Sequence, residues 1–440
     1  MAGEIYLSNL VGNFDYQPIL DKFREYKSQQ ILLLQEKEAD IIQKKSAYKN
    51  FYNLLDTVKD AVDNLLAPSL FSEKSAAVSD ETVMSVSITN PEKLSPTNLD
   101  IQVIKLAQND VLLSDGGQSD KNAAMTDLNS GTFSITYKGN TISVDYDNTD
   151  TLQSIVDKIN TEASNNNVNV NASIFFDGSK YRLLIKGLDT GASSTVSLSD
   201  SNTGTGSLID ELGGFSNPQK AQDAEISIYG NTVTSETNTF SNVIDGLSIE
   251  VKKVSSSPVN VTITNNFQPL KDNLQTLIDN YNTIVDFVKD NSGRDGILSG
   301  DSTPQSIRSQ IFKGLSPLME LGLIDVDKDT GHLSINTEKL DDYIRNDIST
   351  LKDKINQLRD TLKDYLYFTV DPQGPVKSKE KSFDKQIQNI EKKIEIDTKR
   401  IDEEIQIMKK QFVALQMYMA QMEDVKMRLS AMFFNGQQQQ

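Results

Sequence analysis

Residues 387–429 read IQNIEKKIEIDTKRIDEEIQIMKKQFVALQMYMAQMEDVKMRL. Every seventh position carries a large apolar side chain, namely Ile387, Ile394, Ile401, Met408, Leu415, Met422 and Leu429. A second apolar row accompanies the first, with Ile390 near its start and Ile405, Phe412 and Met419 further on. This pattern predicts one long helix with a continuous apolar seam. A helix of about 50 residues extends about 75 Å, longer than a small domain can cover, so its seam requires a partner.

The opposite end of the chain offers a candidate partner for this seam. Between residues 15 and 66, Asp15 suits a helix N-cap, Pro18 suits the first turn, and Pro68 stands just past the end. Apolar residues recur there at helical spacing: Ile19, Phe23, Tyr26, Leu33, Ile41, Tyr48, Tyr52, Leu55, Val58, Val62 and Leu65. We therefore expect helices at both termini.

The middle of the chain has the alternation typical of β-strands. It appears in residues 83–88, 99–104, 168–176, 181–186, 224–229, 247–251 and 259–263, and in a hairpin over 131–146. A short helix is expected at 151–162, and the polar stretch 109–128 is interpreted as a loop. After Pro269, three helical stripes follow, over 270–288, 307–315 and 340–362. The predicted fold class is α+β, a long helical coiled-coil stalk from both termini with an inserted β-rich head.

This reading divides the chain into five parts. We expect an N-terminal helix at 1–40, flexible in the monomer, and a C-terminal coiled-coil helix at 386–440. A helical stalk domain combines 41–69 with 268–385. An inner β-rich head domain combines 70–109 with 241–267, and an outer β-rich head domain spans 110–240.

Charge and composition narrow the function classes. The net charge is −18, and residues 67–376 hold 42 acidic and 24 basic side chains whereas the two ends hold 20 of each. Such a middle section repels phosphate, so nucleic acid is not an expected partner. With no Cys and one His, thiolate nucleophiles, His-based triads and zinc sites are excluded. The first residues lack the features of a cleavable signal peptide, and no run approaches the roughly 18 apolar residues of a membrane span, so no membrane insertion is expected.

Several motif-like pieces have structural interpretations that outweigh the functional ones. Residues 325–331 open like an EF-hand loop but lack Gly at the sixth position and Glu at the twelfth, so a hairpin turn is favoured over a calcium site. His332 beside this turn has no second His or Cys to support catalysis. Residues 204–206 form a loop rather than a phosphate cradle. We therefore predict no enzyme activity, cofactor or metal.

The Met-rich end of the last helix leaves two interpretations open. Met417, Met419, Met422, Met427 and Met432 could form an intramolecular core or an adaptable contact surface, and the contact surface is favoured. The candidate oligomer or filament contacts are the apolar residues of both terminal helices: Ile19, Phe23, Tyr26, Leu33, Ile387, Ile394, Ile401, Met408, Phe412, Leu415, Met419, Met422 and Leu429.

The following pieces, in this order along the chain, resemble the flagellar hook-associated protein 2 family, the filament cap proteins. They are Phe14-Asp15 with Ile19-Leu20, the stretches 131–135, 151–160 and 221–230, the strand-turn element 240–249 with the hairpin 321–335, and the helix end 410–422. The resemblance covers nearly the whole chain.

The resemblance implies an extracellular structural assembly factor, secreted through the flagellum's own channel and needed for motility. Members form a homo-oligomeric plate of about five or six copies at the filament tip and guide exported flagellin into the filament. The implied partners are the chain itself, flagellin and a flagellar export chaperone. An alternative from the polar head strands is a surface adhesin active in cell adhesion, whose head (110–240) binds host mucin or glycans.

Overall fold

The computed structural model describes residues 15–65, 67–241 and 243–436, with side chains up to residue 431. Residues 1–14 of the predicted N-terminal helix, the Met432 side chain and Gln437–Gln440 lie outside the described residues. The chain divides into two compact units, a stalk unit (Met1–Ala67 with Pro269–Gln440) and a head unit (Pro68–Gln268). Helices at both ends and a β-rich insertion confirm the predicted α+β class.

In its described residues, the stalk unit consists of helices, their connections and one small hairpin. Its elements are α1 (Gln17–Asn64), α4 (Gln268–Ser292), α5 (Thr303–Gly314), α6 (Ser316–Glu320), β16 (Ile324–Val326), β17 (Leu333–Ile335), α7 (Thr337–Asn346), α8 (Ile348–Val370) and α9 (Pro375–Gly436). The hairpin turn expected at residues 325–331 is confirmed. The single helix expected over 340–362 is wrong, because Asp347 ends α7 and accepts a hydrogen bond from the Thr350 N–H to start α8.

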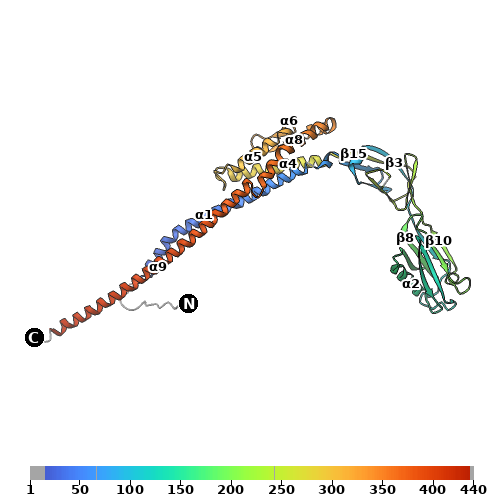
Figure 1. Ribbon diagram of the computed structural model, residues 1–440, viewed down its shortest axis with the longest axis horizontal. Coiled ribbons are helices and arrows are strands. Elements are labelled where there is room, and N and C mark those ends of the chain that lie inside the picture. Colours follow the sequence, from blue (N-terminus) through green and yellow to red (C-terminus); the bar gives the residue numbers. More distant parts are fainter. Residues whose placement is uncertain (1–14, 66, 242, 437–440) are drawn as a thin grey trace. The chain divides into compact units, whose positions relative to one another are not determined.

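The stalk core forms where α4, α5, α6 and α8 gather along the C-terminal half of α1 (Figure 1). Tyr48, Phe51, Leu55 and Val58 on α1 are fully buried. Phe51 stacks on Phe287 of α4 with ring centroids 5.0 Å apart. The predicted N-cap Asp15 is wrong by one position, because Tyr16 holds the N-cap of α1 and makes no side-chain capping bond. Asp15 Oδ1 still accepts a hydrogen bond from the Gln17 N–H in the first turn at 3.0 Å.

The head unit contains an inner body of two antiparallel sheets. Its elements are η1 (Pro68–Phe71), β1 (Lys74–Val78), β2 (Met84–Ile88), η2 (Pro91–Lys93), β3 (Thr97–Lys105), β11 (Ala224–Ile228), β12 (Asn231–Ser235), β13 (Thr239–Phe240), β14 (Leu247–Val251) and β15 (Val259–Asn265). One sheet has the order β1-β15-β3-β11-β12 and the other β13-β14-β2. Both contribute alternate apolar side chains to one core.

The outer body of the head unit has its own core. Its elements are β4 (Asn109–Ser114), β5 (Gly131–Tyr137), β6 (Asn140–Tyr146), α2 (Leu152–Asn165), β7 (Val170–Phe176), β8 (Tyr181–Thr190), β9 (Val196–Asp200), α3 (Leu208–Glu211) and β10 (Phe215–Gln219). The sheets run β10-β4-β8-β7 and β6-β5-β9. The β5–β6 hairpin and α2 are confirmed, and Thr151 and Ser154 form a capping box at the start of α2.

Two features of the head differ from the sequence expectations. The start of the expected loop over 109–128 is strand β4, whose polar residues Asp110 and Ser114 point into the core and are hydrogen-bonded there. Strands β11, β12 and β13, which lie in the residues assigned to the outer domain, pair within the inner body instead. The chain therefore returns to the inner body about 20 residues earlier than the predicted boundary at 240.

Candidate functional site: the paired terminal helices

The terminal helices α1 and α9 lie side by side and run in opposite directions (Figure 1). Contacts that link higher residue numbers on α1 to lower ones on α9 establish this direction. Tyr16, at the N-cap of α1, stacks on Phe412 with ring centroids 5.4 Å apart. Further in, Lys27 pairs with Glu404 at 2.9 Å, and the Tyr48 ring meets the edge of Phe383 at 5.5 Å. We call residues 17–40 of α1 with 386–412 of α9 the arm.

Within the arm, the predicted seam of α9 faces α1. Ile401 is buried, and Ile387, Ile394, Met408 and Phe412 are half-buried. The seam is therefore covered within a single chain as far as Phe412. The sequence left open whether the terminal helices pair within or between chains, and in this structure they pair within one chain.

On α1, the side chains that face α9 are not the ones singled out from the sequence. Leu20 is buried, and Ile31 and Leu34 are half-buried against α9. The predicted row is instead exposed, with Tyr26 and Leu33 the most open, Ile19 also exposed and Phe23 half-buried. The covered row consists of Leu20, Lys27, Leu34 and Ile41, and it lies one position after the predicted row Ile19, Tyr26 and Leu33. Because this row contains a lysine, apolar spacing alone did not identify it.

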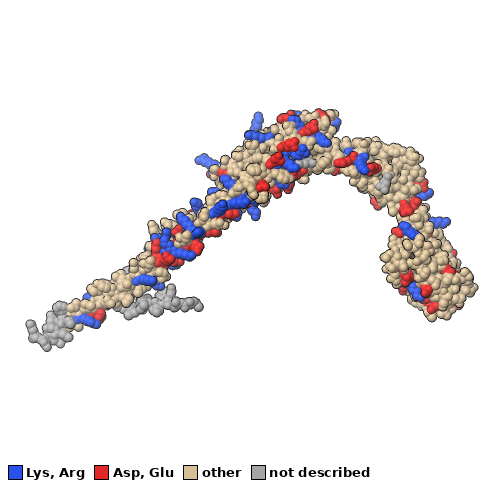
Figure 2. Space-filling view, viewed as in Figure 1, with Lys and Arg blue, Asp and Glu red and all other residues tan. Residues whose placement is uncertain are grey.

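Beyond Phe412, α9 continues without the cover of a described residue of α1. We call residues 413–431 the tail. Its predicted contact residues are about half exposed: Leu415 47%, Met419 45%, Met422 54% and Leu429 50%. Every described side chain from Gln421 to Ala431 is exposed. Figure 2 shows charges of both signs along the α1/α9 pair and a largely uncharged stretch on α9 beyond it.

The tail also contains apolar residues that the sequence reading missed. Tyr418 is 61% exposed and Val425 is 48% exposed. Together with the predicted row they give Leu415, Tyr418, Met422, Val425 and Leu429, which follow the alternating three- and four-residue spacing of a coiled-coil seam. Their signal was present in the sequence, but the choice of Met419 for the second row concealed it. These five side chains have the spacing of a helix-binding stripe, and no described residue of α1 covers them.

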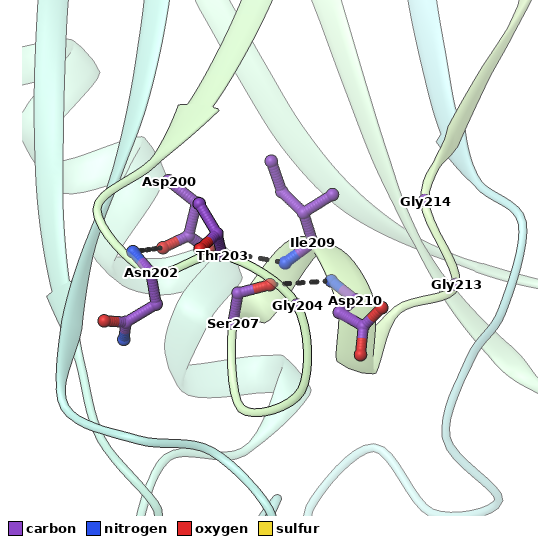
Figure 3. A pocket seen from close by; sticks show the side chains of 9 residues that line it. All are labelled: Asp200, Asn202, Thr203, Gly204, Ser207, Ile209, Asp210, Gly213 and Gly214. Carbon is purple, nitrogen blue, oxygen red and sulfur yellow. Dashed lines mark hydrogen bonds between the residues drawn. The ribbon is translucent and has the colours of Figure 1, made fainter.

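The described part of the head has shallow hollows lined by polar residues. Figure 3 shows the hollow around the loop 202–206, where Asp200 accepts hydrogen bonds from the Asn202 and Ile209 N–H groups at 3.0 and 3.4 Å. The Leu208 N–H donates a third bond to Asp200 at 2.9 Å. Asp200 also accepts from the Tyr146 hydroxyl at 2.5 Å. Both of its carboxylate oxygens therefore hold the loop in place, and this use leaves the carboxylate no free role in chemistry.

Other side-chain chemistry points the same way. Among the described residues, no three His, Cys, Asp or Glu side chains are grouped as metal ligands. His332 Nε2 lies 2.7 Å from Asp286 Oδ1 on the stalk surface. None of the helices in the described residues combines the length and apolarity needed to cross a bilayer. A stalk of paired helices with an exposed apolar end, carrying a β head, defines the class of a structural assembly protein.

The family follows from comparison with known proteins. A family model described as flagellar hook-associated protein 2 N-terminus matches residues 12–110, and one described as flagellar hook-associated protein 2 C-terminus matches residues 221–424. A flagellar hook-associated protein 2 of Aquifex aeolicus is 30% identical over 360 residues, which cover 78% of this chain and 79% of that protein. The chain therefore belongs to the flagellar hook-associated protein 2 family.

One further relative matches more of the chain, and a solved structure matches a similar share of it. The B-type flagellar hook-associated protein 2 of Pseudomonas aeruginosa is 25% identical over 444 residues, which cover 89% of each chain. The crystal structure of the flagellar cap protein FliD D1-D2-D3 domains from Escherichia coli matches with a TM-score of 0.59 and 23% identity, over 77% of this chain and 99% of that one. That structure shares the fold of the stalk and head.

Proposed function

We propose that this protein caps the tip of the bacterial flagellar filament as an oligomeric plate. The plate guides the polymerisation of exported flagellin and prevents its loss. Membership of the hook-associated protein 2 family supports a cap role, and the Escherichia coli protein of the same fold is described as a flagellar cap protein. The tail of α9 is the observation that carries the proposal, because a stripe of apolar side chains without a described partner marks an interaction surface.

The contact residues divide by their environment in the single chain. Ile387, Ile394, Ile401, Met408 and Phe412 hold the arm together within the chain. On our proposal, Leu415, Met419, Met422 and Leu429 contact the filament end or a neighbouring copy, and so does the exposed row Ile19, Tyr26 and Leu33, with Phe23 at its edge. Burial of this surface contributes roughly 25 cal/mol per Å² only after assembly, so the contact forms at the filament tip rather than in the free chain.

The exposed apolar stripe of the tail is our reason to expect an export partner. An exposed apolar helix of this kind favours self-association before the chain reaches the tip. We infer that the flagellar export chaperone covers the tail until secretion, after which the chain acts outside the cell. The head strands give no specific support to the adhesin alternative, because the hollows described on the head are shallow and polar.

A complementation experiment in a strain that lacks its own copy of this gene tests the proposal. The triple variant Leu415→Glu, Met422→Glu, Leu429→Glu places charges on the stripe, and we expect short or absent filaments with flagellin lost to the medium. The matched control Ala420→Glu, Ser430→Glu, Ala431→Glu adds the same three charges to the same helix away from the stripe and its flanking positions, and should restore motility. Filaments of normal length from the triple variant, with export of both variants verified in the medium, would overturn the proposal.

A further inference from the structure

Three helices of the stalk unit meet at a single carboxylate. Asp301 precedes α5, and its Oδ1 accepts a hydrogen bond from the Thr303 N–H at 2.9 Å. Its Oδ2 accepts one from the Tyr48 hydroxyl on α1 at 2.6 Å and another from Lys379 Nζ on α9 at 3.0 Å. Tyr48 is fully buried. Asp301 therefore joins α1, the start of α5 and the second turn of α9.

Further contacts fasten the first turns of α9 to α1 at the same level. Lys377 Nζ lies 3.8 Å from the centre of the Tyr52 ring, a cation–π contact. Phe383 packs against the ring of Tyr48, and Lys45 forms an ion pair with Asp384. We call these contacts, together with those of Asp301, the root clamp. All of its α9 residues lie between 377 and 384.

Outward from the root clamp, the pairing of the two helices is weaker. Leu20 is the one buried side chain among residues 17–40 of α1, whereas α1 beyond Ile41 carries a continuous buried face. On α9, Asp397 lies in the seam with 8% of its surface exposed, and it forms an ion pair with Arg400 of the same helix at 3.1 Å. A carboxylate in a coiled-coil seam lowers the stability of the pair.

We propose that Asp301 is a positioning residue that sets the limit of arm opening. The arm helices separate as one unit, and their separation stops at the root clamp. Further opening would withdraw the Tyr48 hydroxyl and Lys379 from a partly buried carboxylate. We expect this to cost more free energy than separating a seam in which α1 contributes a single buried side chain and α9 carries a buried charge. This property belongs to the single chain and goes beyond the cap function, so it holds or fails independently of assembly.

Hydrogen exchange read by mass spectrometry on the full-length chain, at a concentration where light scattering gives a monomer, tests the limit. We expect the two helical segments of the arm, 17–40 and 386–412, to exchange their amide hydrogens at a common rate. Residues 45–55 and 375–384 should exchange at least about tenfold more slowly, because their opening must break the clamp. A gradual change along both helices, or one rate from end to end, would overturn the proposal.

Substitution identifies the residue responsible for this limit. Asp301→Asn should raise exchange in 45–52 and 375–384 by roughly tenfold or more, with α4 still protected, since a hydrogen-bonded charge has been lost. The matched control Asp402→Asn removes the Arg24 ion pair within the arm and should leave the root clamp unchanged. Root exchange equal to that of the wild type in Asp301→Asn, or an equal rise in Asp402→Asn, would overturn the assignment.

A second variant tests the proposal if Asp301→Asn unfolds the stalk through loss of the hydrogen bond from the Thr303 N–H at the start of α5. Lys379→Met removes the α9 contact and leaves the bonds from Tyr48 and Thr303 to Asp301 in place. A rise in exchange over 375–384 with protected α4 supports the proposal, and unchanged exchange there overturns it.

Discussion

Asp110 shows how one buried polar residue organises a body of the head. It is 2% exposed, and its Oδ2 accepts a hydrogen bond from the Val196 N–H at 2.7 Å. Its Oδ1 accepts from Asn217 Nδ2 at 2.8 Å and from the Ala221 N–H at 3.1 Å. The carboxylate thus ties strand β4 to the start of β9 and to the segment around β10.

Removal of this acceptor should destabilise the outer body. Asp110→Ala leaves three donors without their partner, and we expect a loss of about 3 kcal/mol. Differential scanning calorimetry of the full-length chain measures the change. Asp127→Ala, which removes an exposed carboxylate from the same body, should stay within about 0.5 kcal/mol of the wild type. Equal melting temperatures for the two variants would refute the role of Asp110.

The carboxyl of Asp301 makes the stalk sensitive to acid. Burial acts to raise its pKa, but hydrogen bonds from Tyr48, Thr303 and Lys379 outweigh burial and hold the pKa at about 2, below the ordinary 3.8. Because the folded-state pKa is lowered, the stabilisation is complete above pH 3.8 and is lost as the pH falls through about 2.

Comparison with Asp301→Asn isolates this contribution from those of other carboxylates. We expect the wild type to melt at a higher temperature than the variant at pH 5, and the difference to shrink steadily between pH 4 and pH 2. Thermal unfolding followed by circular dichroism at each pH measures it. A difference that stays constant down to pH 2 would show that the charge of Asp301 does not stabilise the stalk.

Of the two terminal helices, α9 has a contact face that could be predicted from the sequence, whereas the contact face of α1 could not. The seam of α9 repeats an apolar residue every seven positions, so its face was identified correctly as far as Phe412. On α1 two adjacent heptad rows are both largely apolar, and only tertiary contact decides which one is covered. The break at Asp347 was missed because an N-cap looks like any polar residue within a helical stripe.

The predictions of a loop at the position of β4 and of a domain boundary at 240 were wrong for a related reason. Asp110 and Ser114 have the composition of a loop, and their burial depends on donors from strands more than 60 residues away in sequence. The order of the strands also depends on pairing between distant segments, which local alternation does not encode. The presence of the hairpins and of α2 did follow from local signals, because turn glycines and capping residues act within a few positions.

The helices α5 and α8 approach each other closely at Gly314. A Cβ on Gly314 would lie 2.1 Å from Leu362 Cδ2 and 2.5 Å from its Cγ, and Leu362 is fully buried. Because neither element can yield without disturbing the stalk core, we expect Gly314→Ala to lower stability by about 1–3 kcal/mol. Urea unfolding followed by circular dichroism measures this loss. Ser306→Ala on the exposed face of α5 serves as the control, and an equally small effect of both substitutions would refute the close packing.

For the molecule as a whole, the net charge is distributed unevenly between the two units. Residues 68–268, the head unit, hold 24 acidic and 12 basic side chains, whereas the terminal helices are balanced. The exposed coiled-coil stripe lies on the stalk unit alone. An acidic head keeps copies apart in solution, while a neutral apolar end favours contact with another helical surface. This division suits a protein that assembles through its stalk.

Electron microscopy of purified chain mixed with uncapped flagellar filaments tests the cap proposal most directly. We predict plates with leg-like projections at one end of the filaments for the full-length chain, and bare filament ends for a chain that ends at residue 412, which keeps the arm and lacks the tail. Plates that form equally well without the tail, or full-length chain that binds along the filament sides and not at the tip, would contradict the account.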